Sequence, residues 1–415
     1  MSTAVQDLGR RAREASCVLA TASTAIKDDA LLVAADLLVD RSSTLLDANA
    51  ADVETAQADG MEAAPLDRLR LTEARIEAMA TGLRQVASLA DPVGEVLDGN
   101  RRPNGLEIQR VRVPLGVVAV IYENRPNVTS DAAGICLKAG NAALLRGSST
   151  ALRSNQAIAA VLRDGVAKAG LPPDAVLLVE DTSHETAIEF MRLEEYIDCL
   201  IPRGGPSLIR SIRENATVPV IIDGDGNCHV YVDAAADLDE ALDIVVNSKT
   251  NRPGVCNAAE SLVVHEAVAD VFVPRVGQVL ADAGVELLGD DGARSRFAMG
   301  VATDDDYATE FLALKMTVAV VPSLDAAIAH VNRFGSGHTE AIVTRDLDTA
   351  RRFTREADAA VVIVNASTRF TDGERFGFGA EIGISTQKLH ARGPMGLREL
   401  TTYKYLVWGD GHVVS

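Results

Sequence analysis

The chain has 415 residues, too many for one small hydrophobic core, which predicts two or three domains. Forty Lys and Arg residues against 59 Asp and Glu residues give a net charge of −19. A surface this acidic repels nucleic acids and anionic membranes, so neither is expected as a partner. A small anionic ligand is still compatible with this charge, because it responds to the local field and not to the total.

The sequence shows no targeting or disulfide pattern. Residues 1–14 are polar and charged and lack the apolar centre of a signal peptide. No run approaches the ~18 apolar residues of a membrane span. The cysteines have no paired spacing, which argues against a disulfide framework or a structural metal site. We therefore expect a cytoplasmic protein with no resident metal. The five cysteines are Cys17, Cys136, Cys199, Cys228 and Cys256.

The first quarter of the chain predicts helices. Apolar residues recur every three or four positions in 30–46 and 71–89, and the segment 98–105 is dense in turn formers and predicts a linker. Residues 106–113 then alternate as a strand does. We assign 1–105 to helices that pack on a cofactor domain.

Two sets of apolar runs alternating with helical patterns follow, which is typical of parallel sheets covered on both faces. The first set of strands is expected at 116–122, 142–145, 175–179, 196–201 and 218–222, with helices including 154–169 and 206–215. The second set is expected at 229–232, 260–265, 318–321, 340–344 and 359–364, with helices at 238–248, 324–334 and 347–357.

The end of the chain has a different character. The last fifty residues are rich in Gly, Thr and Arg and predict mostly loop, with a final strand at 401–408. The domain prediction is therefore 116–227 for an α/β cofactor domain, 228–365 for an α/β catalytic domain and 366–395 for a loop segment returning to the cofactor domain. Strands in 106–115 and 396–415 would form a protruding, apolar-edged sheet that joins subunits.

Cys256 stands apart from the other thiols. It follows a helical pattern and a Pro-Gly break, and loops beside rigid elements often carry catalytic groups. Arg252 and Lys249 would favour its thiolate. A packed loop cysteine is the alternative. Cys17, Cys136 and Cys199 lie in apolar patterns and predict core positions, and Cys228 beside His229 on a strand would point to the opposite face.

Several motifs resemble one known family. Residues 251–257 (NRPGVCN) resemble the cysteine motif of the γ-glutamyl phosphate reductase family, a branch of the aldehyde dehydrogenase superfamily. Residues 120–129 (VIYENRPNVT), 226–233 (GNCHVYVD), 365–373 (NASTRFTDG), 376–386 (FGFGAEIGIST) and 389–397 (LHARGPMGL) resemble further signatures of that family in the same order. The resemblance implies an α/β, aldehyde dehydrogenase-like fold: a Rossmann-type cofactor domain, an α/β catalytic domain and a small β flap for oligomerisation.

The resemblance also implies a reaction, in which L-glutamyl 5-phosphate is reduced by NADPH to L-glutamate 5-semialdehyde and phosphate in proline biosynthesis. Cys256 would be the nucleophile that displaces phosphate and forms a thioester. Its own N–H and Asn127 would stabilise the oxyanion. The alternative for Asn127 is a cap of a helix starting at Val128.

One departure from the superfamily pattern concerns water activation. The glutamate that oxidising relatives use to hydrolyse the thioester is missing, and Asp223 stands in its slot with no assigned role. This absence favours a reductase over an aldehyde-oxidising semialdehyde dehydrogenase, which is the alternative function. A scaffold that has lost activity is disfavoured by the intact cysteine motif.

The resemblance places the cofactor on three stretches of the chain. In 146–149 (RGSS) a serine replaces the acid that oxidising relatives use on the adenosine ribose, which favours NADP(H) through Arg146, Ser148 and Ser149. The turn Gly204–Gly205 before a helix would hold the pyrophosphate. Glu310 would match the acid on the nicotinamide ribose, although surface glutamates are common.

The substrate carries a phosphate, a carboxylate and an ammonium group. The anionic groups have five candidate partners, Arg252, Ser367, Thr368, Arg369 and His390, and Glu381 is the candidate for the ammonium. For each, the alternative is a structural role in its loop. We also expect a homo-oligomer, and a channelling contact with the upstream kinase, glutamate 5-kinase, is a candidate interaction that the sequence itself does not show.

Overall fold

The computed structural model describes residues 3–222 and 224–414. The chain divides into two compact units. Unit 1 consists of Met1–Ile222, Phe378–Gly383 and Met395–Ser415, and unit 2 of Asp223–Gly377 and Ile384–Pro394. The division after Ile222 differs from the sequence-based boundary between 227 and 228, and the segment 366–395 is shared between the units.

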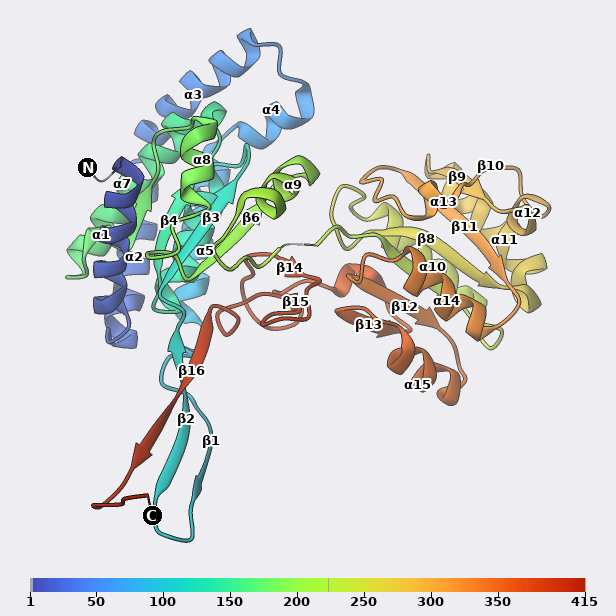
Figure 1. Ribbon diagram of the computed structural model, residues 1–415. Coiled ribbons are helices and arrows are strands. Elements are labelled where there is room, and N and C mark those ends of the chain that lie inside the picture. Colours follow the sequence, from blue (N-terminus) through green and yellow to red (C-terminus); the bar gives the residue numbers. More distant parts are fainter. Residues whose placement is uncertain (1–2, 223, 415) are drawn as a thin grey trace. The chain divides into compact units, whose positions relative to one another are not determined.

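Unit 1 is built on a four-stranded parallel sheet in the order β5-β4-β3-β6 (Figure 1). The strands are β3 (Val117–Tyr122), β4 (Ala142–Arg146), β5 (Val176–Leu178) and β6 (Cys199–Arg203). In register, Val120 of β3 lies between Leu145 and Ile201. Every residue of β3 is buried, because helices cover both faces of the sheet.

The helices of this sheet come from the crossovers and from the N-terminal region. The crossover helices are α6 (Asn127–Lys138), α7 (Leu152–Lys168), α8 (His184–Phe190) and α9 (Pro206–Asn215). The N-terminal helices are α1 (Ala4–Leu19), α2 (Thr24–Asp40), α3 (Ser42–Ala58), α4 (Ala63–Leu69) and α5 (Glu73–Ser88). Helix α1 contacts β3 and β4, whereas α2 packs on α5 and α7. Thr3 and Gln6 form a capping box that starts α1.

A three-stranded antiparallel sheet, here called the flap, extends from unit 1 (Figure 1). It consists of β1 (Val96–Arg101), β2 (Glu107–Pro114) and β16 (Thr401–Trp408), with β2 in the centre. The prediction of a linker over 98–105 and of helices throughout 1–105 was therefore wrong. The strand β1 pairs with β2 across a short turn, and this pairing outweighs the turn-forming residues Gly99 and Asn100 within it.

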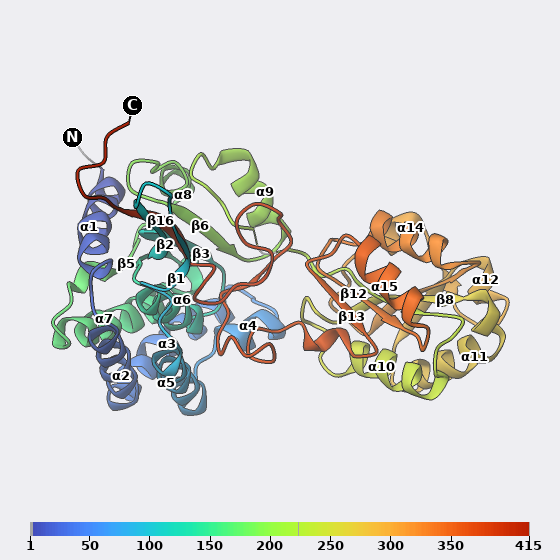
Figure 2. The same ribbon diagram turned by 90° about the horizontal axis from the view of Figure 1, so that it is seen from below.

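Unit 2 contains a seven-stranded parallel sheet in the order β10-β9-β11-β8-β7-β12-β13. The strands are β7 (Cys228–Val232), β8 (Ala259–His265), β9 (Glu286–Gly289), β10 (Gly300–Val301), β11 (Lys315–Val321), β12 (Thr339–Val343) and β13 (Val361–Val364). Figure 2 shows α10 (Leu238–Thr250) and α11 (Glu266–Asp282) on one face, and α14 (Leu324–Phe334) and α15 (Leu347–Glu356) on the other. Each face has its own apolar cluster, around Phe272 and Phe353 respectively.

Smaller elements complete the chain. They are η1 (Ser149–Ala151), η2 (Pro173–Ala175), α12 (Asp291–Arg294), α13 (Asp304–Tyr307), η3 (Thr368–Phe370), β14 (Ile384–Ser385) and β15 (Gly393–Pro394). Two expectations about local structure were wrong. Residues 218–222 make only an isolated bridge between Leu200 and Val220, and Cys17 is exposed and not part of the core. Among the described residues, no helix is long and apolar enough to cross a bilayer.

Candidate active site

Cys256 lies on the loop that connects α10 to β8. Helix α10 ends at Thr250 and β8 begins at Ala259, and the thiol-bearing residue between them is half-buried. The segments that precede β7, β8, β11 and β12 meet at the amino edge of the sheet, because these strands run parallel. The loop is therefore held by rigid elements on both sides, as the sequence predicts.

Gly226 and Cys228 pack closely against the backbone of Cys256. A Cβ added to Gly226 would lie 1.6 Å from the carbonyl oxygen of Cys256, so only glycine fits at this position. The buried Cys228 thiol donates to the same carbonyl at 3.1 Å. The amide of Asn257 donates to the carbonyl of Thr371 at 2.7 Å. Neither Gly226 nor Asn257 was a predicted site residue, and the spacing of glycine before Cys228 was the signal that could have found the first.

The predicted substrate residues of the 367–369 segment lie against this loop. The Thr368 hydroxyl donates to the carbonyl of Asn257 at 2.7 Å, and the Ser367 hydroxyl lies 3.0 Å from that of Ser248. Both side chains are buried. The hydrogen bonds of these two hydroxyls position the loop. They correspond to the structural role that was the alternative to substrate binding.

Arg369 is the predicted substrate residue whose charge interacts with several neighbours. It donates from Nε to the Asn251 side chain at 3.2 Å and is half-buried, whereas Arg252 is exposed. The pKa of the Arg369 guanidinium is lowered, first by burial and then by the charge of Arg252; the charge of Asp372 raises it, that of Arg375 lowers it and that of Cys256 raises it. Three positive charges against the one carboxylate of Asp372 favour a further anion here.

The predicted effect of Lys249 on the thiol is altered by a buried partner. Lys249 is fully buried, and its Nζ lies 2.5 Å from a carboxylate oxygen of Glu260, which is also buried. The other Glu260 oxygen accepts the Leu312 N–H at 3.0 Å. Burial raises the pKa of Glu260 to about 7 and lowers that of Lys249. The pair carries no net charge when both are ionised, so Lys249 offers the thiol less positive field than the sequence suggests.

Two further predicted residues are on unit 2. A carboxylate oxygen of Glu310 accepts the N–H of Gly226 at 2.8 Å, which links the predicted ribose-binding acid to the glycine beneath Cys256. His390 is exposed and has a left-handed backbone with φ of 70°. Asp223 lies outside the described residues. Among the described residues, no group of three or more His, Cys, Asp or Glu side chains is arranged to hold a metal ion.

Apart from Glu310, the predicted cofactor residues lie at the carboxyl edge of the unit 1 sheet, where open parallel sheets bind their ligands. Arg146 ends β4 and donates to the carbonyls of Thr182 and Ser183, each at 2.9 Å. The Ser148 hydroxyl donates to Asn124 at 2.6 Å, and Ser149 is exposed at the start of η1. Burial lowers the pKa of Arg146.

The turn before α9 already holds an anionic group. The Gly205 N–H donates to the carboxylate of Glu123 at 3.1 Å. A Cβ on Gly204 would lie 2.7 Å from the same side chain, so glycine lets the carboxylate approach. This role of Glu123 was missed, because nothing in the sequence pairs residue 123 with residue 205. The Gly205 N–H thus donates to an anionic oxygen, which in this structure belongs to Glu123.

Asn127 and Glu381 are both on unit 1. Asn127 is the first residue of α6, and its amide donates to Asp131 at 2.8 Å. Pro126 occupies the N-cap position with no side-chain cap bond, so the alternative role of Asn127 as a helix cap was wrong. Glu381 is half-buried in the segment Phe378–Gly383 that returns to unit 1.

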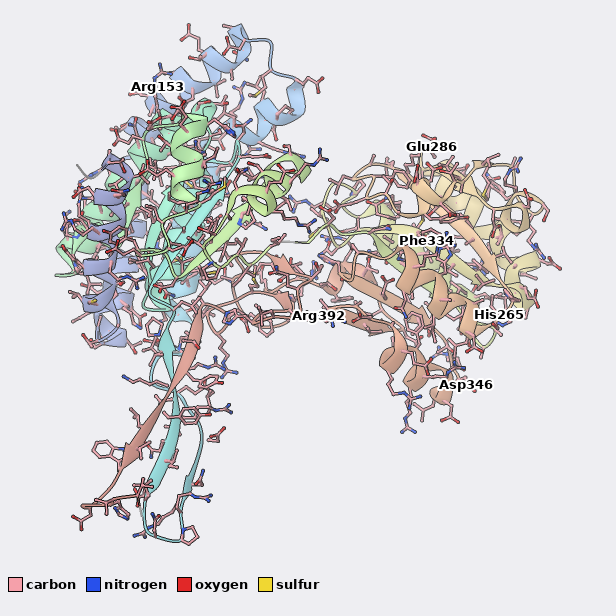
Figure 3. All side chains as sticks on the ribbon, in the orientation of Figure 1. Arg153, His265, Glu286, Phe334, Asp346 and Arg392 are labelled. Carbon is pink, nitrogen blue, oxygen red and sulfur yellow. The ribbon has the colours of Figure 1, made fainter. Side chains whose placement is uncertain are left out.

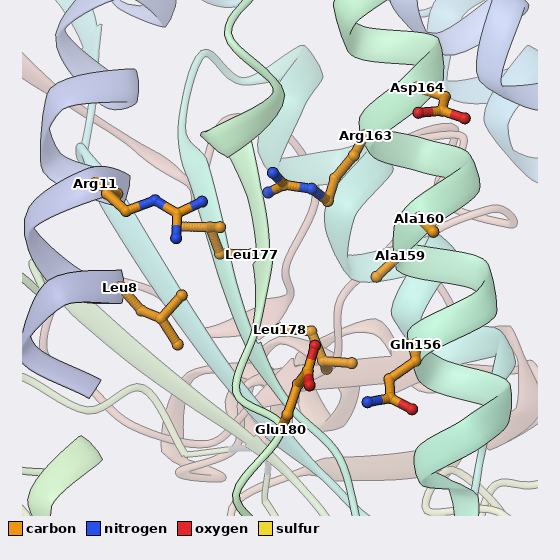
Figure 4. A pocket seen from close by; sticks show the side chains of 10 residues that line it. All are labelled: Leu8, Arg11, Gln156, Ala159, Ala160, Arg163, Asp164, Leu177, Leu178 and Glu180. Atoms are coloured by element: carbon orange, nitrogen blue, oxygen red, sulfur yellow. The ribbon is translucent and has the colours of Figure 1, made fainter. Parts of the chain in front are cut away.

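A pocket of about 360 Å³ on unit 1 contains none of the predicted site residues. It lies between α1, α7 and β5 (Figure 4). Arg11 and Arg163 at its wall both bind Asp174. A carboxylate oxygen of Asp7 also lies 3.9 Å from Arg11, so two carboxylates within the protein compensate the two cations.

Comparisons with known proteins agree along the whole chain. The aldehyde dehydrogenase family matches residues 2–305 and 300–405. The chain is 57% identical to the γ-glutamyl phosphate reductase of Heliobacterium modesticaldum over 98% of this chain and 97% of that one. It is 55% identical to that of Thermobifida fusca over 99% and 98%. The crystal structure of the γ-glutamyl phosphate reductase of Thermotoga maritima superimposes with a TM-score of 0.98 at 47% identity and covers 100% of both chains.

Proposed function

The chain belongs to the aldehyde dehydrogenase family, in its γ-glutamyl phosphate reductase branch, and from this premise we propose an NADPH-dependent reduction through a thioester on Cys256. The substrate is L-glutamyl 5-phosphate, and the products are L-glutamate 5-semialdehyde and phosphate. This is the reductase step of proline biosynthesis. The support is identity above 50% along nearly full length to relatives that bear this enzyme's name.

The single observation that carries the thioester is the half-buried Cys256 on a loop whose backbone is held by hydrogen bonds from Cys228 and Thr368. The Cys256 thiolate attacks the acyl carbon, the carbon–oxygen bond to phosphate breaks, and phosphate leaves with its electron pair. Arg252 and Arg369 stabilise the phosphate dianion as it departs. After reduction, the carbon–sulfur bond of the hemithioacetal breaks, the aldehyde leaves, and the thiolate is regenerated.

The remaining substrate contacts are proposals on the same footing. His390 is proposed to bind the anionic groups of the substrate together with Arg252 and Arg369. Glu381 is proposed to bind its ammonium group. Ser367 and Thr368 hold the loop by hydrogen bonds to Ser248 and Asn257, so their contribution is the shape of the site. Asn127 is the proposed side-chain donor to the oxyanion, together with the N–H of Cys256.

The residues at the carboxyl edge of the unit 1 sheet fit a nicotinamide dinucleotide. The Gly205 N–H accommodates an anionic oxygen, since it holds the Glu123 carboxylate in this structure. Arg146, Ser148 and Ser149 offer a cation and hydroxyls for a 2′-phosphate, and the 146–149 loop has no acid that would repel it. Glu310 is the proposed partner of the nicotinamide ribose. When bound, the reduced cofactor supplies the hydride.

The decisive experiment substitutes Cys256→Ser and measures NADPH consumption with glutamate, ATP and the upstream kinase. Loss of turnover by at least about 10³-fold is expected, because the hydroxyl is a much weaker nucleophile. The reverse reaction from glutamate semialdehyde and NADP+ separates this function from an aldehyde-oxidising one. It requires phosphate or arsenate to cleave the thioester, and equal rates without either anion would support the oxidising alternative.

The cofactor assignment has its own test. Ser149→Glu places a carboxylate where the 2′-phosphate is proposed, and repulsion raises the KM for NADPH while that for NADH changes little. Ser295→Glu, on the surface of unit 2 after α12, is the matched charge control. Unchanged preference in the Ser149 variant would refute the assignment.

We further propose a homo-oligomer joined through the flap, whose strand β16 exposes Tyr403, Tyr405 and Trp408. A channelling contact with glutamate 5-kinase is proposed from the lability of the acyl phosphate. The five free cysteines fit a reducing compartment such as the cytoplasm.

A further inference from the structure

Beneath the thiol-bearing loop lies a polar cluster that the reaction does not use directly. It consists of Cys228, His338, Thr339 and Thr371, all fully buried. These residues come from the starts of β7 and β12 and from the segment after β13. Buried polar groups cost stability unless they are fully hydrogen-bonded, so four such residues in one place indicate a role beyond filling the core.

The donor and the acceptor of each hydrogen bond in the cluster follow from one another. The Thr339 hydroxyl donates to that of Thr371 at 3.0 Å, so its oxygen accepts from Nδ1 of His338 at 2.8 Å. That nitrogen therefore carries the proton, and it also lies 3.6 Å from the Cys228 sulfur. The sulfur thus faces a protonated nitrogen, and the Cys228 thiol donates its own proton to the carbonyl of Cys256 at 3.1 Å.

The peptide group between Cys256 and Asn257 is fixed by this bond. Gly226 packs tightly against the same peptide group, because a methyl group added to this glycine would overlap the Cys256 oxygen. The next carbonyl, that of Asn257, accepts the Thr368 hydroxyl. The backbone on the carboxyl side of Cys256 is thus held at two successive carbonyls. This sets the ψ angle of Cys256, and so fixes how its N–H and its side chain are oriented relative to the anchored carbonyl.

We infer that Cys228 is a positioning residue for the nucleophile: its thiol holds the Cys256 carbonyl and so aims the Cys256 sulfur and N–H at one acyl group. This inference rests on the proposed function of Cys256. Cys228 touches no substrate and keeps its proton throughout. Its alternative role is to fill space in the core, as Cys136 does on α6.

The test compares three substitutions of Cys228 in the full chain. Cys228→Ala and Cys228→Val remove the donor, and Cys228→Ser keeps a donor on a shorter bond. We expect kcat to fall about 10-fold in the Ala and Val variants, because a misplacement well below 1 Å costs less than the 100-fold of a full ångström. The Ser variant recovers kcat to within about 3-fold of the wild type. KM for glutamate semialdehyde in the phosphate-dependent reverse reaction stays within about 2-fold throughout.

Cys136→Ala is the matched control, because it removes a buried thiol of unit 1 that no described hydrogen bond links to the loop. A space-filling role predicts equal effects of the Cys228 and Cys136 substitutions on kcat, and no advantage of Ser over Val at position 228. Either result overturns the inference. If the Ala variant does not fold, the comparison of Ser with Val decides.

Alkylation by iodoacetamide, located by peptide mass, separates this inference from the proposed function. If modification of Cys256 abolishes activity while Cys228→Ala turns over at the wild-type rate, only the positioning role is refuted. If the Cys256-alkylated enzyme keeps its activity, the thioester proposal is refuted and the inference with it. Inactivation by alkylation together with a slow, serine-rescued Cys228→Ala variant supports both.

Discussion

Replacing Lys249 by methionine tests how the buried ion pair of unit 2 contributes to stability. The substitution keeps most of the side-chain volume and leaves the Glu260 carboxyl buried, with the Leu312 N–H still donating to it. Removing one partner of a buried pair costs about 3–5 kcal/mol, because the remaining charge is uncompensated. That is a large fraction of the 5–15 kcal/mol that stabilises a typical domain.

The loss depends on pH in a direction fixed by the carboxyl. Burial raises the pKa of Glu260 to about 7 even beside the lysine, and removing the cation raises it further. The folded Lys249→Met protein then holds a proton that the unfolded chain has released. Its stability falls as pH rises above the ordinary value near 4.5, by about 1.4 kcal/mol for each pH unit, until the folded-state pKa is reached.

The matched variant is Lys249→Met with Glu260→Gln, which removes both charges and keeps an acceptor for Leu312. It should regain at least about 2 kcal/mol of the loss and show no such pH slope. The free energy of unfolding of unit 2 is measured by denaturant titration that is monitored through hydrogen exchange of β8 and β11. Fluorescence of the single tryptophan, Trp408, would report only the flap of unit 1. Wild-type stability of Lys249→Met, or a flat profile between about pH 5.5 and 7.5, would falsify the reasoning.

Three further predictions follow from single contacts. Burial lowers the pKa of His338 from 6.5 to about 4, so this residue should contribute a loss of about 3 kcal/mol in the stability of unit 2 as pH falls through that interval; hydrogen exchange of unit 2 should show a smaller loss for His338→Asn than for the wild type, and an equal loss would contradict the assignment. Gly226→Ala should lower kcat about 100-fold by displacing the Cys256 carbonyl, whereas Gly82→Ala on α5, with only a 4.0 Å neighbour, should not; similar rates would show that the loop adapts. Tyr405→Asp should shift the proposed oligomer to smaller species in light scattering, while Val271→Asp on α11 should not; an unchanged mass would remove the flap from the interface.

Local pattern was sufficient for most of the fold. The apolar runs that became β3, β4 and β12 were predicted within a residue or two, and the bounds of α14 and β16 agree with the structure. Helix α11 was missed because it is apolar over much of its surface and contains Pro274, so no clean periodicity marks it. The run 218–222 is apolar enough for a strand, but Pro219 cannot donate to a ladder and only a bridge forms.

The candidate site shows the same division between local and long-range information. Cys256 could be found from its loop and its motif, since both are contiguous in sequence. The buried contacts of Lys249 with Glu260 and of Gly226 with Glu310 depend on how strands are placed side by side, which no local pattern records. The cluster of T-shaped and tilted ring contacts among Phe334, labelled in Figure 3, His330 and Tyr307 was likewise beyond prediction.

The discontinuous composition of unit 1 has a consequence for how the chain is made. Its strand β2 finds its partner β16 only after nearly the whole chain has been synthesised, because unit 2 intervenes. Until then β2 can pair only with β1, and its other edge is open to other chains. The seven-stranded sheet of unit 2, whose strands all lie within 228–364, can close earlier. A ribosome-bound chain ending near residue 395 should therefore protect unit 2 from proteolysis while the flap stays cleavable.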